Sequence, residues 1–322
     1  MIEVRSLQKK VLFILLLGFS LLSLFVGVKS VPVTSLIHLT PEQSLVLWTT
    51  RIPRTLSLLI AGATIAVNGL IMQQLTQNKF VSPTTAGTMD SAKLGILIAM
   101  LFFHDSSILV RSGIAFVFSL LGTFVFLRLI QKLPQYNQLM IPLIGLMYGN
   151  VIGAVVTFFA YQFQLIQNMS SWLQGNFATV TKGSFELMYL AFPLLLVVQL
   201  YAQHFTLAGL GKDTATAVGL NYKKTQWLGL TIVAMSSSVV LVTVGTLPFL
   251  GVVVPNIVSL FYGDYLKETV SITAICGSLF LVVSDILARL VIAPYEVPVS
   301  LIVSVIGSLL FIGLLIRGYR NE

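Results

Sequence analysis

The stretch 55–75 (TLSLLIAGATIAVNGLIMQQL) constrains the fold more than any other part of the chain. It contains no charged residue, and a helix of this length, rising about 1.5 Å per residue, reaches across the roughly 30 Å hydrocarbon core of a bilayer. Gly62, Ala63, Ala66 and Gly69 recur at three- and four-residue spacing and give the helix a small-residue face. Such a face packs closely against another membrane helix. We therefore expect a spanning helix inside a helical bundle.

Apolar runs of this kind recur along the whole chain. They lie at 11–28, 86–103, 108–130, 139–160, 185–202, 226–247, 249–262, 270–291 and 298–316. Charged residues make up 9% of the 322 residues, against about 25% in ordinary soluble domains. The run 249–262 is short and holds Pro255 and Asn256, so hydropathy leaves nine or ten crossings open. The sequence predicts one domain, residues 1–322, that is an all-α polytopic membrane protein of about ten transmembrane helices.

The net charge of +8 comes from basic residues scattered singly between apolar runs, so no patch for nucleic acid is formed. With the amino terminus in the cytoplasm, about twice as many Lys and Arg residues fall in cytoplasmic connections as at the outer face, as the positive-inside rule requires. We therefore expect a multi-pass protein with both termini in the cytoplasm and no nucleic-acid partner.

No set of residues with catalytic spacing is present in the sequence. His38, His104 and His204 lie far apart, and no His-x-x-x-His pair or Gly-x-Ser-x-Gly motif occurs. The single Cys276 lies in an apolar run and cannot form a disulfide within one chain. We expect no catalytic residue, no metal site and no cofactor on this chain, and hence no enzymatic activity of its own.

The hydrophilic connection 203–225 has the pattern of two short helices that meet near 209–211. Asp213 or Thr214 could cap the second helix, and Gly219 could end it. The glycines do not have the spacing of a Walker phosphate-binding loop. The local pattern leaves open whether this segment is only a solvated loop between two membrane helices.

Three arginines stand at predicted membrane boundaries. Arg51 and Arg54 lie one helical turn apart before the stretch 55–75, and Arg289 follows Asp285 by four residues. These positions fit interfacial snorkelling or an intrahelical Asp285–Arg289 pair.

Asp90 and Lys93 form a charged pair within the predicted span 86–103. A helix places residues three apart on neighbouring surface. An unpaired Lys at the centre of a membrane helix costs about 2.5–3.5 kcal/mol, so some compensation is required. Lys93 is therefore expected to pair with Asp90, to snorkel toward the interface, or to face a path through the protein.

A series of motifs, spread over nearly the whole chain, carries a resemblance to a known family. In chain order they are R-x-P-R (51–54), AGATIAVNG (61–69), Q-x-L-T-x-N-K-F-x-S-P (73–83), SSWLQGNF (170–177), LAGLGKDTATAVGL (207–220), PFLGVVVPN (248–256) and SDILAR (284–289). In these motifs and their order, the chain resembles the membrane subunits of bacterial iron–siderophore and cobalamin ABC importers.

The resemblance implies a type II ABC importer permease fold, with ten helices around a path that forms between two permease subunits. It implies a second permease subunit, two cytoplasmic ATPases that bind ATP and Mg²⁺, and an extracytoplasmic binding protein. The segment 75–95 is most similar to permeases for catecholate siderophores of the petrobactin and enterobactin type. In that branch a heterodimer is expected, although a homodimer stays open. Transport of haem or cobalamin, or ion-coupled secondary transport, are the alternatives.

The resemblance also implies functional residues. Those that match the ATPase-coupling loop are Leu210, Gly211, Lys212, Asp213, Ala217 and Gly219. In the family, certain arginines bind acidic side chains of the binding protein, and Arg51, Arg54 and Arg289 stand at the matching positions. By position, the gate falls near Tyr136, Asn137 and Gln138, which are bulkier than the family's residues. Lys93, beside Asp90, is a path candidate because a cation would favour an anionic ferric chelate.

The chain departs from the family at two places. Asn256 and Ser259 stand where the family commonly has His and Arg, and Gly-Ser-Leu at 307–309 replaces Gly-Ala-Pro. Whatever the His and Arg pair does in relatives cannot be transferred to this chain.

Overall fold

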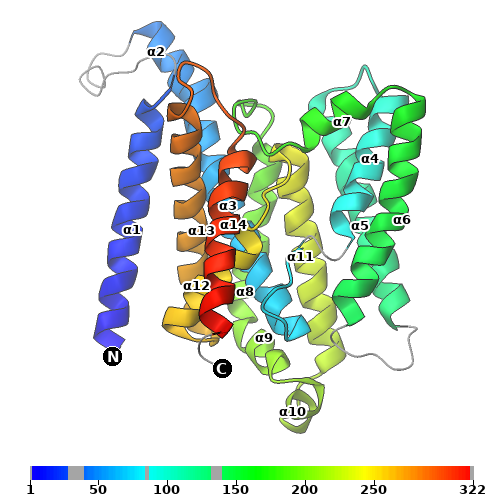
Figure 1. Cartoon of the computed structure of the whole chain (residues 1–322), viewed down its shortest axis with the longest axis vertical. Helices are drawn as coiled ribbons and strands as arrows, with labels where there is room; N and C mark the ends of the chain where they lie inside the picture. The colour runs from blue at the N-terminus through cyan, green and yellow to red at the C-terminus, as the bar shows by residue number, and fades with distance from the viewer. Residues whose placement is uncertain (1, 28–39, 84–86, 132–139, 320–322) are drawn as a thin grey trace.

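The computed structural model describes residues 2–27, 40–83, 87–131 and 140–319, and these form a bundle of helices (Figure 1). The described residues hold no β-strand, only an isolated bridge between Gln174 and Thr246. The helices are α1 (Ile2–Phe25), α2 (Pro41–Val46), α3 (Ile52–Thr76), α4 (Thr88–Phe102), α5 (Ile108–Gln131), α6 (Met140–Gln162), α7 (Ile166–Leu173), α8 (Ala191–Leu200), α9 (Ala202–Gly209), α10 (Lys212–Ala217), α11 (Tyr222–Val244), α12 (Leu250–Tyr262), α13 (Leu266–Leu290) and α14 (Val299–Tyr319). A π-helical turn (Leu47–Arg51) joins α2 to α3, and a 3₁₀ turn (Glu186–Leu190) precedes α8.

Each predicted apolar run contains a helix, but not every helix is long enough to span a bilayer alone. Among the described residues, seven helices are long and apolar enough to cross a bilayer. The segment Glu186–Leu200, which includes α8, and the following α9 are bent by 62° relative to each other, and together they would make an eighth crossing. The helices in the other two runs are shorter, 15 residues for α4 and 13 for α12. The start of α1 and the end of α14 lie at the same end of the molecule (Figure 1).

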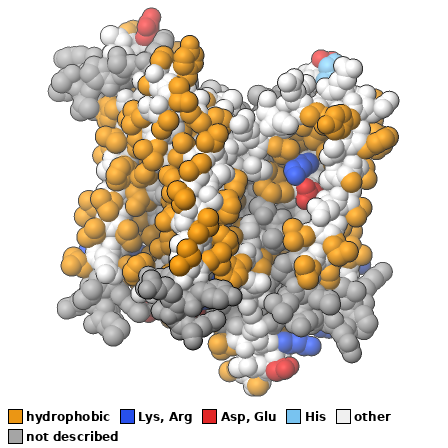
Figure 2. Space-filling view, in the orientation of Figure 1, with side chains coloured by type: hydrophobic (Ala, Val, Ile, Leu, Met, Phe, Trp, Pro, Cys, Tyr) orange, Lys and Arg blue, Asp and Glu red, His pale blue; other side chains and the backbone are white. Residues whose placement is uncertain are grey.

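The helices form two groups joined by α11. One group contains α1, α3, α12, α13 and α14, and the other contains α4, α5 and α6; α11 contacts α3 on one side and α4 and α5 on the other. Figure 2 shows a hollow between the two groups and apolar side chains over most of the visible face. Large apolar side chains such as Met147 and Leu309 are exposed on α6 and α14, as expected for surfaces that meet lipid.

The small-residue face predicted for α3 is buried against neighbouring helices. Gly62 faces Gly277 of α13 so closely that a methyl group on either residue would collide with the backbone of the other. A methyl group on Gly69 would likewise collide with the backbone of Gly251 of α12, and Ala66 is fully buried. The expectation of close helix–helix packing is confirmed, and it places α3 at the centre of its group.

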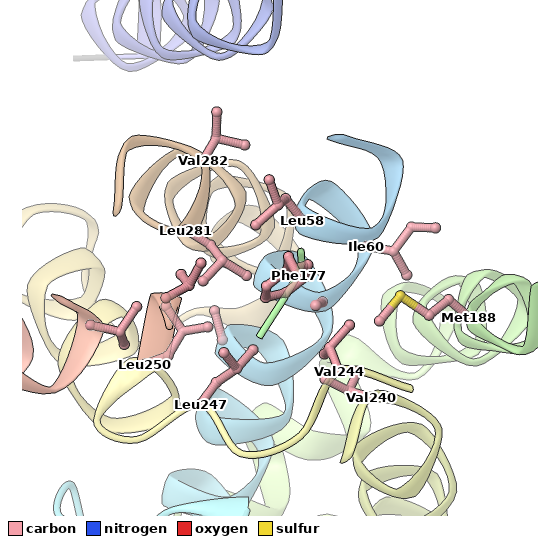
Figure 3. Close-up of a cluster of buried hydrophobic side chains, with 14 of the residues drawn as sticks. Leu58, Ile60, Phe177, Met188, Val240, Val244, Leu247, Leu250, Leu281 and Val282 are labelled. Atoms are coloured by element: carbon pink, nitrogen blue, oxygen red, sulfur yellow. The ribbon is translucent and has the colours of Figure 1, made fainter. Parts of the chain in front are cut away.

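Apolar and polar contacts together hold α3 against α11 and α13. Figure 3 shows Leu58 of α3 beside Leu281 of α13, with Phe177 within the same buried cluster. Lower in α3, the buried Asn68 amide donates to Ser236 Oγ at 2.7 Å and to Ser237 Oγ at 2.9 Å on α11. Hydrogen bonds of this kind stabilise helix association in a membrane, where the hydrophobic effect contributes little to it.

Candidate functional sites at the two ends of the bundle

The connection 203–225 forms the two predicted short helices, α9 and α10, which meet at 209–211. Gly211 has φ +100°, so the turn between the helices uses a conformation that side-chain-bearing residues rarely adopt. The end of α10 is also as predicted, because Gly219 has φ +84° and the Leu220 N–H donates to the Ala215 carbonyl at 3.0 Å. The predicted cap is wrong: α10 begins at Lys212 after Gly211, without a side-chain cap.

The misplaced cap has a simple physical cause. The glycine turn starts α10 two or three positions earlier than a cap at Asp213 or Thr214 would, so Asp213 lies inside the first turn. A carboxylate in a first turn still interacts favourably with the helix dipole, by about 0.3–1 kcal/mol. Asp213 is thus compatible with the helix although it does not cap it.

The α9–α10 pair projects from the end of the molecule at which α1 starts and α14 ends (Figure 1). Phe205 and Ala215 are fully buried and hold the pair against the bundle. Leu210 and Val218 are apolar yet 57% and 63% exposed. Of the six residues predicted here, Gly211 is half-buried and the others are exposed, namely Leu210, Lys212, Asp213, Ala217 and Gly219. An exposed apolar tip on a polar end is typical of a protein-contact surface.

The three boundary arginines converge at the opposite end of the bundle. Arg54 donates to Asp285 Oδ1 from Nε at 3.1 Å and from a terminal nitrogen at 2.7 Å, and its other terminal nitrogen lies 2.7 Å from Glu296 Oε2. Arg289 forms the predicted intrahelical pair with Asp285. Asp285 is fully buried and therefore joins α3 to α13 through two guanidinium groups.

The cluster also fixes the end of α1 and the π-helical turn. Arg289 donates to the carbonyls of Ser23 and Val26 at 2.9 and 2.8 Å. The Arg51 guanidinium lies against Gly27, and Arg51 is the last residue of the π-helical turn, a distortion that often marks functional positions. Arg51, Arg54 and Arg289 are only 8%, 8% and 4% exposed. The three predicted arginines thus form one site, but a buried one.

Glu296 is the member of this cluster that sequence reasoning missed. It lies in the connection between α13 and α14, 242 residues from its partner Arg54, and its side chain is 24% exposed. No local spacing links two residues so far apart. A weak signal was its position a few residues after Arg289 in a connection that must stay near the same membrane boundary.

Asp90 and Lys93 form the local pair. Their side chains lie 2.8 Å apart in the first turns of α4 and are 24% and 32% exposed. The Asp90 carboxylate packs against Gly149 of α6. Figure 2 shows a basic and an acidic side chain together in the hollow between the two helix groups. The gate candidates Asn137 and Gln138 lie outside the described residues.

The fold and its two specialised ends define a polytopic, all-helical membrane protein of the permease type. Residues 14–317 match the model of the FecCD transport family, and the chain belongs to this family. It is 46% identical to the petrobactin import system permease protein YclN of Bacillus subtilis, over 97% of this chain and 98% of the relative. It is 38% identical to the ferric-anguibactin transport system permease protein FatD of Vibrio anguillarum, over 92% and 95%.

The fold also matches a solved structure. A chain of a metal-chelate type ABC transporter in an inward-facing conformation superposes with a TM-score of 0.86, covering 97% of this chain and 99% of the other at 23% identity. At this identity the likeness concerns the fold alone. It confirms the predicted all-α permease architecture.

Proposed function

We propose that this chain is the permease subunit of an ABC importer that carries a ferric siderophore, of the catecholate type, across the bacterial cytoplasmic membrane. The observation that carries the proposal is 46% identity along nearly the full length of a petrobactin permease. The aligned length includes both the α9–α10 pair and the arginine cluster, so the similarity is not limited to the membrane helices. ATP hydrolysis belongs to a partner subunit.

At the α9–α10 end, we propose contact with a cytoplasmic ATPase that binds ATP and Mg²⁺. The exposed Leu210 and Val218 offer apolar contact area, and Asp213 and Lys212 offer charges beside it. We therefore also propose that both termini lie in the cytoplasm, since the start of α1 and the end of α14 lie at the same end as α9–α10 (Figure 1). Two ATPases would serve two permease subunits, with a heterodimer as the proposed assembly.

At the opposite end, we propose docking of an extracytoplasmic binding protein through Arg51, Arg54 and Arg289. Arg54 pairs with both Asp285 and Glu296, and Arg289 pairs with Asp285. An acidic side chain of the binding protein would take the place of the partly exposed Glu296 at Arg54. Because the guanidinium groups are buried, docking would require a local opening, and the partly exposed Glu296 is where it would begin.

For the path, we propose that Lys93 favours an anionic ferric chelate in the space between two permease subunits. The Asp90–Lys93 pair is about a quarter to a third exposed, so it is accessible without rearrangement of α4. Asn137 and Gln138 are proposed as gate residues by position in the sequence alone.

Uptake by a deletion strain tests the substrate class. The strain would be given iron-labelled petrobactin, a hydroxamate chelate, haem and cobalamin in turn, with and without the restored gene. We expect restored uptake of the catecholate-containing chelate alone, abolished by a Walker mutation in the partner ATPase. Uptake that follows haem or cobalamin, or that persists without the ATPase, would refute the proposal in favour of the other importer substrates or of an ion-coupled transporter.

A further inference from the structure

The turn at the end of α3, residues 77–80, contacts several distant parts of the chain. Gln77 ends the helix in the left-handed conformation, with φ 48° and ψ 33°. For a residue with a side chain this conformation costs about 1–2 kcal/mol, so surrounding contacts must hold it. The Asn78 N–H donates to the Gln73 carbonyl at 3.2 Å, and the Phe80 N–H donates to Asn78 Oδ1 at 2.9 Å. The 77–80 turn therefore has a defined conformation held by its own hydrogen bonds.

Gln77 joins this turn to the α9–α10 pair. Its side-chain Nε2 donates to the Gly209 carbonyl, the last residue of α9, at 2.9 Å. A methyl group on Gly211 would lie 3.0 Å from the same nitrogen, so the glycine turn and Gln77 are in direct contact. An open pocket of about 430 Å³ lies beside this bond and is also lined by Lys79 and Asp264. Gln74 of α3 also lies against Gly209, and the Gln77 bond extends this contact from α3 to the 77–80 turn.

Lys79 joins the same turn to α12. The Asn256 side-chain amide donates to the Lys79 carbonyl at 2.7 Å, and Lys79 Nζ lies 3.2 Å from Ser259 Oγ and 3.5 Å from Asp264. The ion pair is exposed and contributes about 0–1 kcal/mol, so the bond from the buried Asn256 carries the attachment. Asn256 and Ser259, which stand where the family commonly has His and Arg, thus both contact Lys79.

Phe80 joins the turn to α14. Its ring meets the Phe311 ring edge to face, with centroids 5.9 Å apart. Such a pair is worth about 0.5–1.5 kcal/mol beyond its buried area. Gln77, Lys79 and Phe80 of one turn therefore contact the α9–α10 pair, α12 and α14, respectively.

We propose that Gln77 is a positioning residue that transmits displacement of the α9–α10 pair to the 77–80 turn, and through Asn256 and Phe311 to α12 and α14. The proposal rests on the proposed function, in which an ATPase contacts α9–α10. The simpler role for Gln77 is to satisfy one of the free carbonyls at the end of α9. A helix cap affects stability alone, whereas a transmitting residue sets how much substrate moves per ATP.

The test uses the complete complex of permease subunits, ATPases and binding protein in proteoliposomes, with uptake of iron-labelled siderophore and ATP hydrolysis measured together. The variant is Gln77→Ala. The matched control is Gln199→Ala, because the Gln199 amide also donates to a backbone carbonyl, that of Lys267 at 3.2 Å, but this bond joins α8 to α13 and not to the α9–α10 pair. We expect the Gln77→Ala permease to assemble with the ATPase and to leave the rate of ATP hydrolysis unchanged. Uptake per ATP hydrolysed should fall by about fivefold or more, which is the lower end of the range for coupling between sites. Gln199→Ala should leave the ratio unchanged.

Asn256→Ala provides a second test on the same chain of contacts. It should lower uptake per ATP as well, and the double variant should be no worse than the more severe single one, because residues acting in series are not additive. An unchanged ratio in Gln77→Ala, or a loss of uptake that only follows lost assembly, would overturn the inference. If the wild-type complex itself shows no ATP-dependent uptake, the proposed function fails and the inference with it.

Discussion

At the scale of single residues, Asp285 is the group on which the arginine cluster depends. It is fully buried and accepts hydrogen bonds from both Arg54 and Arg289. Removing one partner of a buried ion pair leaves an uncompensated charge and costs about 3–5 kcal/mol. We expect Asp285→Ala to lower the abundance of folded protein in the membrane sharply. Glu296→Gln is the control, because Glu296 is partly exposed and the glutamine side chain still offers Arg54 a hydrogen-bond acceptor.

This prediction is checked by the melting temperature of detergent-solubilised protein and by quantitative blotting of membranes. Equal stability of the two variants would show that the buried carboxylate does not hold the cluster. The same burial explains why reversing all three arginines to Glu is a poor test of docking. Such a variant would place new carboxylates beside Asp285 and would unfold the site before docking could be measured.

Glu296 offers a cleaner test of the docking surface. If an acidic side chain of the binding protein takes the place of Glu296 at Arg54, then Glu296→Gln removes an internal competitor. We expect tighter binding of the binding protein and a steeper dependence of the Kd on salt, since the site gains a net positive charge. Kd values from nanodisc-embedded complexes at two ionic strengths give the answer. Weaker or unchanged binding at low salt would exclude Arg54 from docking.

Variants of the Asp90–Lys93 pair distinguish a structural role of Lys93 from a role in the transport path. Lys93→Met leaves Asp90 without its partner and should reduce abundance, and adding Asp90→Asn should restore it. The double variant then has normal abundance without the cation. We expect it to take up anionic chelates slowly and a neutral chelate at the normal rate. Equal uptake of both kinds per unit of protein would confine the pair to a structural role.

At the scale of elements, the glycine turn between α9 and α10 is the feature most sensitive to substitution. Gly211→Val forces a β-branched residue into φ +100° and brings it against Gln77. Gly183→Val is a matched control, since Gly183 has φ +99°, lies in another loop and has open space around it. We expect both variants to reach the membrane, and only Gly211→Val to reduce uptake and binding-protein-stimulated ATP hydrolysis. Normal values for Gly211→Val would remove this turn from coupling.

Elements were predictable where their signal is local. The small-residue face of α3 and the closure of α10 at Gly219 follow from glycines read in sequence, because a missing Cβ or a positive φ acts at its own position. The lengths of α4 and α12 were not predictable from hydropathy, since an apolar run does not show where the helix inside it starts. The pairing of Arg54 with Glu296 depends on how α3 and α13 pack, which no short window contains.

At the scale of the whole molecule, the two ends differ in kind and must face different compartments. The α9–α10 end exposes Val218, and the opposite end exposes Lys182 in the connection before α8. Single cysteines at these positions, on a Cys276→Ser background, report orientation through a membrane-impermeant thiol reagent. We expect Lys182→Cys to react in spheroplasts and Val218→Cys to react only in inside-out vesicles, because the ATPase proposed to contact α9–α10 is cytoplasmic. The reversed pattern would invert the proposed topology and would place the arginine cluster out of reach of any extracytoplasmic protein.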